Sequence, residues 1–169
     1  MEKYQQVHHE FEPVFDKKSK ILILGSFPSV KSREQHFYYG HPQNRFWKVI
    51  AALTGAQLPQ TVEEKKKMLL DHGIAVWDVI ASCEIIGSSD SSIRNVVPTD
   101  LQLILEEAQI RRIYANGNTA KKLFERFQKK SCGREVAGLP STSPANAAFS
   151  LERLIECWSC ILEDLKEYD

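Results

Sequence analysis

The chain has 169 residues, and its 22 lysines and arginines are balanced by 22 aspartates and glutamates. This length predicts a single domain over residues 1–169, because a chain of about this size buries roughly 68–70% of its unfolded surface around one core. The zero net charge by itself predicts neither a basic coat for nucleic acid nor an acidic tail. There is no run of about 20 apolar residues and no secretion signal, so we expect a soluble, cytoplasmic protein without membrane contact.

The charges are unevenly distributed along the chain. Between Lys31 and Lys48 the cations Lys31, Arg33, Arg45 and Lys48 are accompanied by one acid, Glu34. Residues 150–169 instead carry six acids and two cations. Contact with phosphate depends on the charges at the contact and not on the total. The segment from residue 31 to residue 48 is therefore a candidate phosphate-binding surface.

The four cysteines are Cys83, Cys132, Cys157 and Cys160. They are too few and too scattered for a disulfide framework in a chain of this length. Cys157 and Cys160 have the spacing of a redox motif, but they fall in the middle of a predicted helix and not at its start, where thiolates are activated. No histidine has a convincing ligand spacing from them, so we expect no metal site.

The first half of the chain alternates strands and helices. Residues 20–24 form an apolar run that ends at Gly25, as expected of a buried parallel strand. Apolar residues at helical spacing predict a helix over 44–54, and the capping-box pattern starting at Thr61 predicts a second over 61–72. Residues 74–80 are the next predicted strand. The serine-rich segment 82–97 is predicted to be a functional loop.

The second half continues the alternation. A helix is predicted over 99–109, a strand over 112–115 and a helix over 119–128. Residues 136–139 are one more strand, followed by a proline-bounded loop. The apolar stripe of 151–165 predicts a final helix that packs on the sheet. Alternating strands and helices predict an α/β fold, a three-layer α/β/α sandwich with a short, largely parallel central sheet.

Three segments near predicted strand ends carry the residues suited to chemistry: Gly25–Ser29, His41–Lys48 and Pro140–Asn146. Loops at the carboxyl ends of strands bind ligands in open α/β sheets. The sequence lacks the phosphate-binding P-loop, the dinucleotide fingerprint, the serine-hydrolase elbow and the paired histidines of zinc proteases. A glycine turn with aromatics, an amide and cations instead suits a flat, polar-edged nucleotide base.

These segments resemble known motifs. Gly25-Ser26-Phe27-Pro28-Ser29 resembles the first active-site motif of the uracil-DNA glycosylase superfamily, and His41–Lys48 resembles the segment that follows it in the mismatch-specific branch. Leu139–Asn146 resembles the second motif. Together with Trp77-Asp78-Val79 and Gly87-Ser88-Ser89-Asp90, the set is most similar to the deoxyinosine, or hypoxanthine-DNA, glycosylase branch.

The resemblance implies a uracil-DNA glycosylase-like fold and a monofunctional enzyme that needs no cofactor. Such an enzyme flips a deaminated base, here hypoxanthine, out of DNA and hydrolyses its N-glycosidic bond, leaving an abasic site. The cysteine spacing does not match the iron-sulfur branch, so no cluster is expected. We expect a monomer whose partner is DNA containing a deaminated base.

Two departures from the superfamily pattern bear on the mechanism. Many members have Asp or Asn at the third position of the first motif to orient water, and this chain has Phe27 there. A phenylalanine can stack on a base but cannot hold water, so the polar catalytic role must lie elsewhere. The second motif often begins with His or Asn, where this chain has Ser141. Uracil specificity of the usual kind is therefore not expected.

The resemblance and the residue chemistry together give a set of expected site residues. The catalytic candidates are Asn44, to orient water or bind the base edge, and Asp90, to activate water. The expected base contacts are Gly25, Ser26, Phe27, Pro28, Tyr39, His41, Phe46 and Ser141. The expected DNA contacts are Ser29, Lys31, Arg45, Lys48, Ser143, Pro144, Ala145 and Asn146.

Each role has a structural alternative. Asn44 precedes a helix and suits an N-cap, and Asp90 suits a turn in a serine-rich loop. Phe27 and Tyr39 could be core residues, His41 an ordinary loop residue, and Arg45 and Lys48 solvated cations. At the level of function, the alternatives are a mismatch-specific uracil or thymine glycosylase, a non-catalytic nucleic-acid-binding module, and an enzyme of free nucleosides.

Overall fold

A computed structural model of the chain describes residues 3–167. Its centre is a parallel sheet of four strands in the order β3-β2-β6-β7. The strands are β2 (Ile21–Gly25), β3 (Ile74–Asp78), β6 (Arg112–Asn116) and β7 (Val136–Leu139). All five residues of β2 are buried, which confirms the predicted central strand. Because the strands are parallel, all four carboxyl ends lie along one edge of the sheet.

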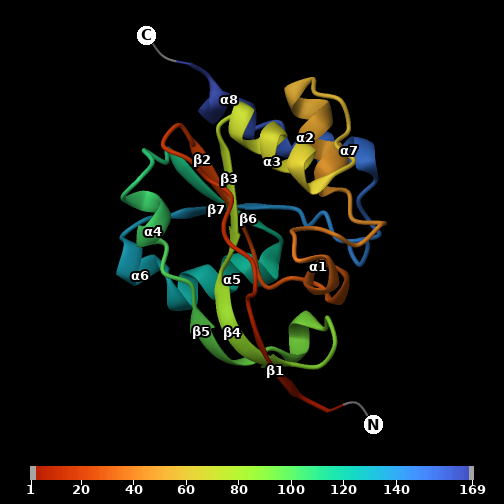
Figure 1. The fold of residues 1–169 in the computed structure, drawn as a ribbon, viewed down its shortest axis with the longest axis vertical. Helices are drawn as coiled ribbons and strands as arrows, with labels where there is room; N and C mark the ends of the chain where they lie inside the picture. Colours follow the sequence, from red (N-terminus) through yellow and green to blue (C-terminus); the bar gives the residue numbers. More distant parts are fainter. Residues whose placement is uncertain (1–2, 168–169) are drawn as a thin grey trace.

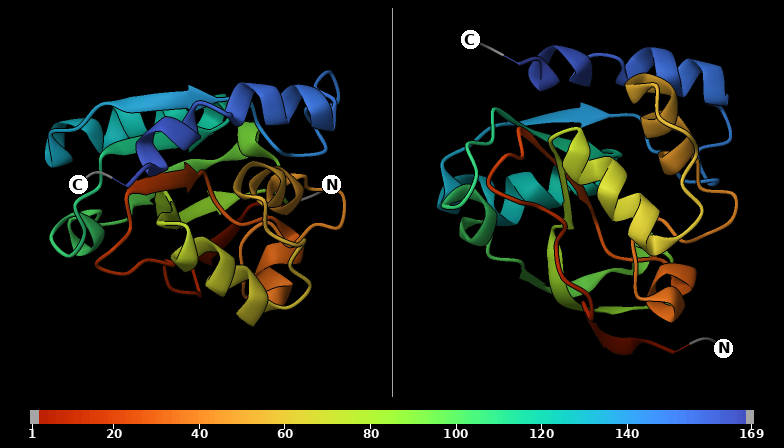
Figure 2. Two further views of the ribbon diagram at one scale, coloured as in Figure 1. Left: turned by 90° about the horizontal axis from the view of Figure 1, so that it is seen from above. Right: turned by 45° about the horizontal axis from the view of Figure 1, so that its top comes forward.

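Helices cover both faces of this sheet (Figure 1). Ile21 and Ile23 face a core built with α2 (Phe46–Thr54), α3 (Val62–Asp71), α7 (Leu151–Trp158) and α8 (Ile161–Leu165). Leu22 and Leu24 face the opposite core, against α4 (Gln102–Leu105), α5 (Asn118–Phe127) and α6 (Lys129–Cys132). Figure 2 shows α2 and α7 side by side. The predicted three-layer α/β/α sandwich is therefore confirmed.

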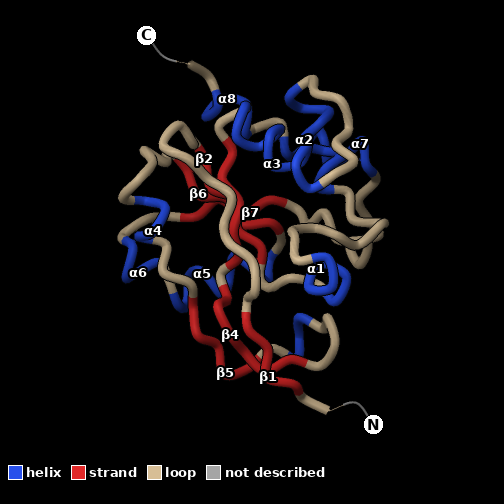
Figure 3. Tube along the Cα trace, viewed as in Figure 1, coloured by secondary structure: helices blue, strands red, loops and turns tan. Residues whose placement is uncertain are grey.

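A second, antiparallel sheet was not predicted. It consists of β1 (Gln5–His8), β4 (Ile80–Ile85) and β5 (Arg94–Pro98) in the order β1-β4-β5, at the end of the molecule where the described chain begins (Figure 3). The predicted strand 74–80 is in fact β3 followed, after one residue, by the start of β4. The expected loop 82–97 contains parts of two strands, whose polar residues pair across the sheet, as when Glu84 accepts hydrogen bonds from Arg94 and Asn95.

Several helix boundaries differ from the predictions. The structure adds α1 (Val30–Gln35), which Ser29 caps by accepting a hydrogen bond from the Ser32 amide. The helix expected over 99–109 is reduced to α4, and the expected final helix is divided into α7 and α8 at Ser159 and Cys160. The capping signal at Thr61 is confirmed, because its hydroxyl accepts from the Glu64 amide. Within residues 3–167, no helix is long and apolar enough to cross a bilayer.

Candidate active site

A cavity of about 290 Å³ opens at the carboxyl edge of the parallel sheet. Gly25 and Asp78, which end β2 and β3, line it together with Asn116 at the end of β6 and Ser141 just after β7. This is the position at which open α/β sheets bind ligands, and the volume is near the lower bound of about 300 Å³ for small-molecule sites. The cavity is the candidate active site.

Most of the expected site residues meet in this cavity. The expected catalytic and base-contacting residues that line it are Gly25, Ser26, Phe27, Pro28, Tyr39, His41, Asn44, Asp90 and Ser141. The expected DNA contacts that line it are Ser29, Ser143, Pro144 and Ala145. Phe46, Lys31, Arg45, Lys48 and Asn146 are not among its lining residues. The segments around Asn44 and Ser141 therefore converge, although almost a hundred residues separate them.

Thr142 joins the two segments. This residue is fully buried. Its hydroxyl donates to Asn44 Oδ1 (2.8 Å) and accepts from Asn116 Nδ2 (3.0 Å), and its backbone amide donates to Asn116 Oδ1 (3.0 Å). The Arg45 amide donates to the Thr142 carbonyl (3.1 Å). Thr142 therefore fixes the positions of both amide side chains relative to the sheet edge.

The orientation of the Asn44 amide follows from these bonds. Its Oδ1 accepts from the Phe46 amide (2.9 Å) as well as from Thr142, which uses both lone pairs of the carbonyl oxygen. Asn44 thus contacts the start of α2 and also lines the cavity, but the N-cap of α2 is Arg45, so Asn44 is not the N-cap residue that the structural alternative proposed. With the oxygen occupied, the group that Asn44 can offer a ligand is its Nδ2 donor. Asn44 suits binding of an acceptor atom better than orientation of water.

Arg45 has a structural contact set that the sequence did not indicate. Its guanidinium donates to the carbonyls of Ser143 (2.9 Å), Asn146 (3.0 Å) and Phe149. These bonds attach the loop after β7 to the start of α2. Arg45 was expected to contact DNA phosphate, but in this structure its donors are directed at the protein's own backbone.

The other cations of residues 31–48 are also only partly available. Arg33 donates to the Gly87 carbonyl (2.7 Å) and lies over the Phe27 ring, 5.7 Å from its centre. Lys31 is paired with Glu34 at 3.5 Å. Lys48 is exposed on α2. The expected basic surface is therefore smaller than the sequence indicated, and phosphate contact by Lys31 and Lys48 stays a prediction.

Tyr39 forms one wall of the cavity in a strained conformation. Its φ of 52° lies in the left-handed region, which bulky residues rarely adopt. Residues held in this conformation cluster at functional sites. The ring stacks on Phe46 with centroids 4.1 Å apart. Phe46 was expected to contact the base directly, but it is fully buried behind Tyr39 and supports that ring instead. Burial, together with the neighbouring Asp78 carboxylate, raises the pKa of the Tyr39 hydroxyl, which therefore stays protonated.

Phe27 and His41 also reach the cavity. Phe27 is half-buried and packs against the apolar cluster of Ile80, Cys83 and Ile85, so it is both a core contact and a lining residue. His41 Nδ1 accepts a hydrogen bond from the Gln43 amide (3.1 Å). That bond assigns the proton of neutral His41 to Nε2, which leaves a donor for a ligand.

Asp90 lies in the short helical turn of Asp90–Ser92, within the segment that joins β4 to β5. The residue is exposed overall, yet its carboxylate borders the cavity and accepts a hydrogen bond from the Ser26 hydroxyl (3.3 Å). Desolvation on the cavity side raises the pKa of Asp90, and the bonds from Ser26 and Thr119 partly oppose this shift. A carboxylate of raised pKa at a cavity mouth is suited to accept a proton from water.

Six lining residues were given no role from the sequence: Ser32, Asp78, Ile85, Ser88, Asn116 and Thr142. Asn116 and Thr142 follow the predicted strands 112–115 and 136–139, whereas Asp78 falls inside the predicted strand 74–80 and ends β3 in the structure. Asp78 appeared only within the motif Trp77-Asp78-Val79. A position at the carboxyl end of a strand was the available signal.

Within the described residues, no group of three His, Cys, Asp or Glu side chains is arranged to hold a metal ion, and all four cysteines are free.

Comparisons with known proteins agree with this geometry. Over residues 12–166 the sequence matches the family model described as the uracil DNA glycosylase superfamily. A protein of Methanosarcina acetivorans named hypoxanthine DNA glycosylase is 37% identical, over 89% of this chain and 95% of its own length. A protein of the same name from Methanosarcina barkeri is 30% identical, over 80% of this chain and 86% of its own.

A solved structure is also similar. A solution NMR structure from Methanosarcina acetivorans, described as a candidate uracil DNA glycosylase, superimposes with a TM-score of 0.78 and 35% identity. The match covers 92% of this chain and 96% of that one. The chain belongs to the uracil DNA glycosylase superfamily.

Proposed function

We propose that this protein is a monofunctional DNA glycosylase that removes hypoxanthine from deoxyinosine in DNA and leaves an abasic site. The observation that carries the proposal is the junction at Thr142, which brings Asn44 and the loop after β7 to one cavity at the sheet edge. The two relatives named hypoxanthine DNA glycosylase match most of the chain and support this choice of base.

The geometry supports a short sequence of steps. Extrusion of the nucleotide costs a few kcal/mol, and least where pairing is already weak, as at a deaminated base. Stacking on Phe27 offsets about 1–3 kcal/mol of this cost. The loop of Ser143, Pro144 and Ala145 lies at the cavity rim, where the DNA strand would pass.

Hydrolysis then breaks the bond between sugar C1′ and the base. The transition state resembles an oxocarbenium ion, so negative charge develops on the leaving base. Asn44 Nδ2 donates a hydrogen bond to that base, which stabilises the charge where it forms. Asp90 accepts a proton from the water that adds to C1′. The base leaves as an anion and takes up a proton from solvent, and Asp90 returns its proton to solvent, so the products are the free base and an abasic sugar. None of these steps uses a lysine nucleophile or a cofactor.

The direct test is release of free base. Duplexes that contain one deoxyinosine, deoxyuridine or mismatched thymine are incubated with the protein, and the released base and alkali-labile strand breaks are measured. We expect release of hypoxanthine, with breaks only after alkali. Release of uracil or thymine alone would favour the mismatch-specific alternative. Binding without any release would identify a non-catalytic module.

The role of Asp90 predicts a pH profile. Because only the carboxylate accepts a proton, the excision rate should fall as the pH decreases through the raised pKa of Asp90. This acid limb should lie above the ordinary aspartate pKa of about 3.9. Single-turnover rates between about pH 4 and pH 8 would measure it. Asp90→Asn should lower the rate at neutral pH and remove the limb.

Thermal unfolding provides the control for this variant. A folded-state pKa above the unfolded value means that Asp90 stabilises the fold only at low pH, and that this contribution is lost as the pH rises through the folded pKa. At neutral pH, Asp90→Asn should therefore not lower the melting temperature. An unchanged acid limb in this variant would show that another group accepts the proton.

A further inference from the structure

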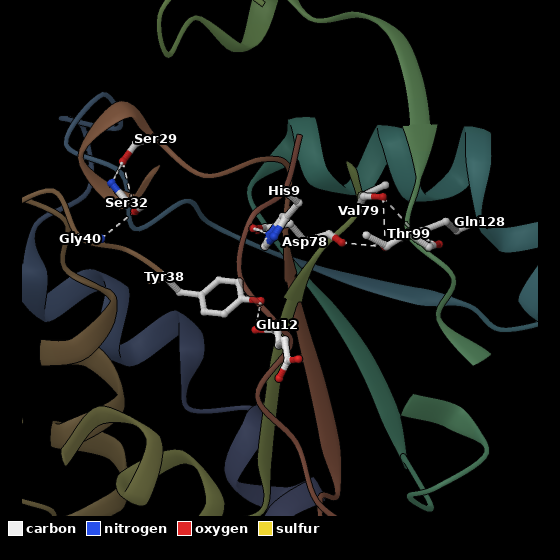
Figure 4. A network of polar contacts seen from close by, with 10 residues as sticks. All are labelled: His9, Glu12, Ser29, Ser32, Tyr38, Gly40, Asp78, Val79, Thr99 and Gln128. Carbon is white, nitrogen blue, oxygen red and sulfur yellow. Dashed lines mark hydrogen bonds and ion pairs between the residues drawn. The ribbon is translucent and has the colours of Figure 1, made fainter. Parts of the chain in front are cut away.

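Asp78 is a buried carboxylate at the floor of the cavity to which the steps above give no role. It ends β3, and its side chain is 5% exposed. Oδ2 accepts a hydrogen bond from His9 Nε2 at 2.8 Å, and the His9 side chain is also 5% exposed (Figure 4). The aromatic rings of Phe11, Phe27 and Tyr38 surround His9. His9 thus holds one oxygen of Asp78 in a fixed position.

The other oxygen faces the cavity. Asp78 Oδ1 lies 2.5 Å from the point where a Cβ atom on Gly25 would be, and the Tyr39 hydroxyl oxygen lies 3.2 Å from the same point. Gly25 is therefore required here, because any side chain would collide with the carboxylate. Tyr39 Oη is buried and, although the Asn116 side chain lies close enough to lower its pKa, it makes no hydrogen bond of normal geometry within the described residues. A carboxylate acceptor and a hydroxyl donor thus converge on the space beside Gly25.

An acceptor next to a donor is complementary to one chemical group, a ring N–H beside a C=O. Hypoxanthine presents this pair at N1–H and O6, and uracil presents it at N3–H and O4. Adenine and cytosine, from which these bases arise by deamination, present a bare ring nitrogen beside an amino group instead. Opposite an adenine or cytosine, the Asp78 carboxylate would face a lone pair and the Tyr39 donor would face another donor.

We propose that Asp78 and Tyr39 determine the base specificity of this enzyme. The pair binds the N–H and C=O edge of a deaminated base and rejects adenine and cytosine, the amino bases from which deaminated bases arise. Asp78 Oδ1 accepts the ring N–H, and Tyr39 Oη donates to the carbonyl oxygen. Thymine and guanine also carry a ring N–H beside a C=O, so the pair separates deaminated bases from adenine and cytosine only. The inference rests on the proposed glycosylase function and deepens it.

The test compares two substrates within one protein preparation, so that the folded fraction cancels. Duplexes carry either deoxyinosine or deoxynebularine, whose purine base has a bare N1 and no oxygen at C6. The measured quantity is the ratio of kcat/KM for the two. In Asp78→Asn, the side-chain oxygen should keep the hydrogen bond from His9 Nε2. The amide NH2 group then takes the place of Asp78 Oδ1 and presents a donor to the cavity. We expect the ratio to fall about 10- to 100-fold, the range for losing a hydrogen bond to a charged group.

Two further variants separate specificity from structure. Asp90→Asn makes the same chemical change at the cavity mouth and should slow both substrates by the same factor. Tyr39→Phe keeps the stack on Phe46 and removes a hydroxyl that makes no hydrogen bond of normal geometry, so its melting temperature should decrease little or not at all. Its ratio should nevertheless fall several-fold. This second variant also decides the matter if Asp78→Asn does not fold.

The possible outcomes distinguish the inference from the proposed function. Wild-type protein that releases neither hypoxanthine nor uracil overturns the proposed function, and the inference with it. Wild-type protein that releases hypoxanthine, with an unchanged ratio in the variants of Asp78 and Tyr39, overturns the inference alone. If wild-type protein is specific for uracil, the ratio of kcat/KM is measured for deoxyuridine and deoxycytidine instead, and an unchanged ratio in the Asp78 and Tyr39 variants again overturns the inference.

Discussion

Replacing Asn44 by alanine should lower the single-turnover rate of hypoxanthine release by about 10²- to 10³-fold, the usual effect of removing one donor from a charge-stabilising site. The physical reason is that Asn44 Oδ1 is occupied by the Phe46 amide and by Thr142, so Nδ2 is the atom directed at a ligand. Rates are measured on a deoxyinosine duplex with enzyme in excess over DNA.

The variant Asn44→Asp separates catalysis from the hydrogen bond that Asn44 accepts at the start of α2. Aspartate keeps the oxygen that accepts from the Phe46 amide. It replaces the donor with a second oxygen. We therefore expect Asn44→Asp to be as impaired in base release as Asn44→Ala, whereas only alanine should lose the roughly 1 kcal/mol contributed by the hydrogen bond from the Phe46 amide. Full activity of either variant would assign Asn44 to structure alone.

Replacing Arg45 by alanine should produce the largest loss of stability among the expected site residues. The guanidinium binds three backbone carbonyls, those of Ser143, Asn146 and Phe149. Removal leaves these carbonyls without their charged donor and detaches the loop after β7 from α2. We expect the free energy of unfolding to fall by about 1.5–3 kcal/mol, the range for hydrogen bonds to a charged group. Urea-induced unfolding would measure it.

Lys48→Ala is the matched control for Arg45. Lys48 is a cation three residues further along the chain and is exposed on α2. Its replacement should change stability by less than about 0.5 kcal/mol. Arg45→Lys should not restore the wild-type value, because a single ammonium group cannot reach three carbonyls with the geometry of a guanidinium. Equal stability of the Arg45→Ala and Lys48→Ala variants would show that the three contacts contribute little.

Much of the fold was determined by the sequence alone. The apolar run before Gly25 is buried at every position of β2, and the capping pattern at Thr61 begins a helix where expected. The alternation of strands and helices led to the correct three-layer arrangement, because parallel strands require covering helices on both faces. The motifs around Gly25, Asn44 and Ser141 also identified the superfamily, since the chemistry of a site requires particular residues in a particular order.

The tertiary structure alone decided what each side chain contacts. No local pattern reveals that Arg45 binds carbonyls about a hundred residues away, that Phe46 lies behind Tyr39, or that Thr142 connects Asn44 with Asn116. The antiparallel sheet was missed partly for the same reason, because β1 pairs with β4 from far along the chain. Its other pair, β4 with β5, joins neighbouring strands across a serine-rich segment that favoured a loop. Periodicity reports which face of an element is buried, whereas the partner of a polar group is set by how the elements pack. The opposition of Asp78 and Tyr39 across Gly25 is such a packing result.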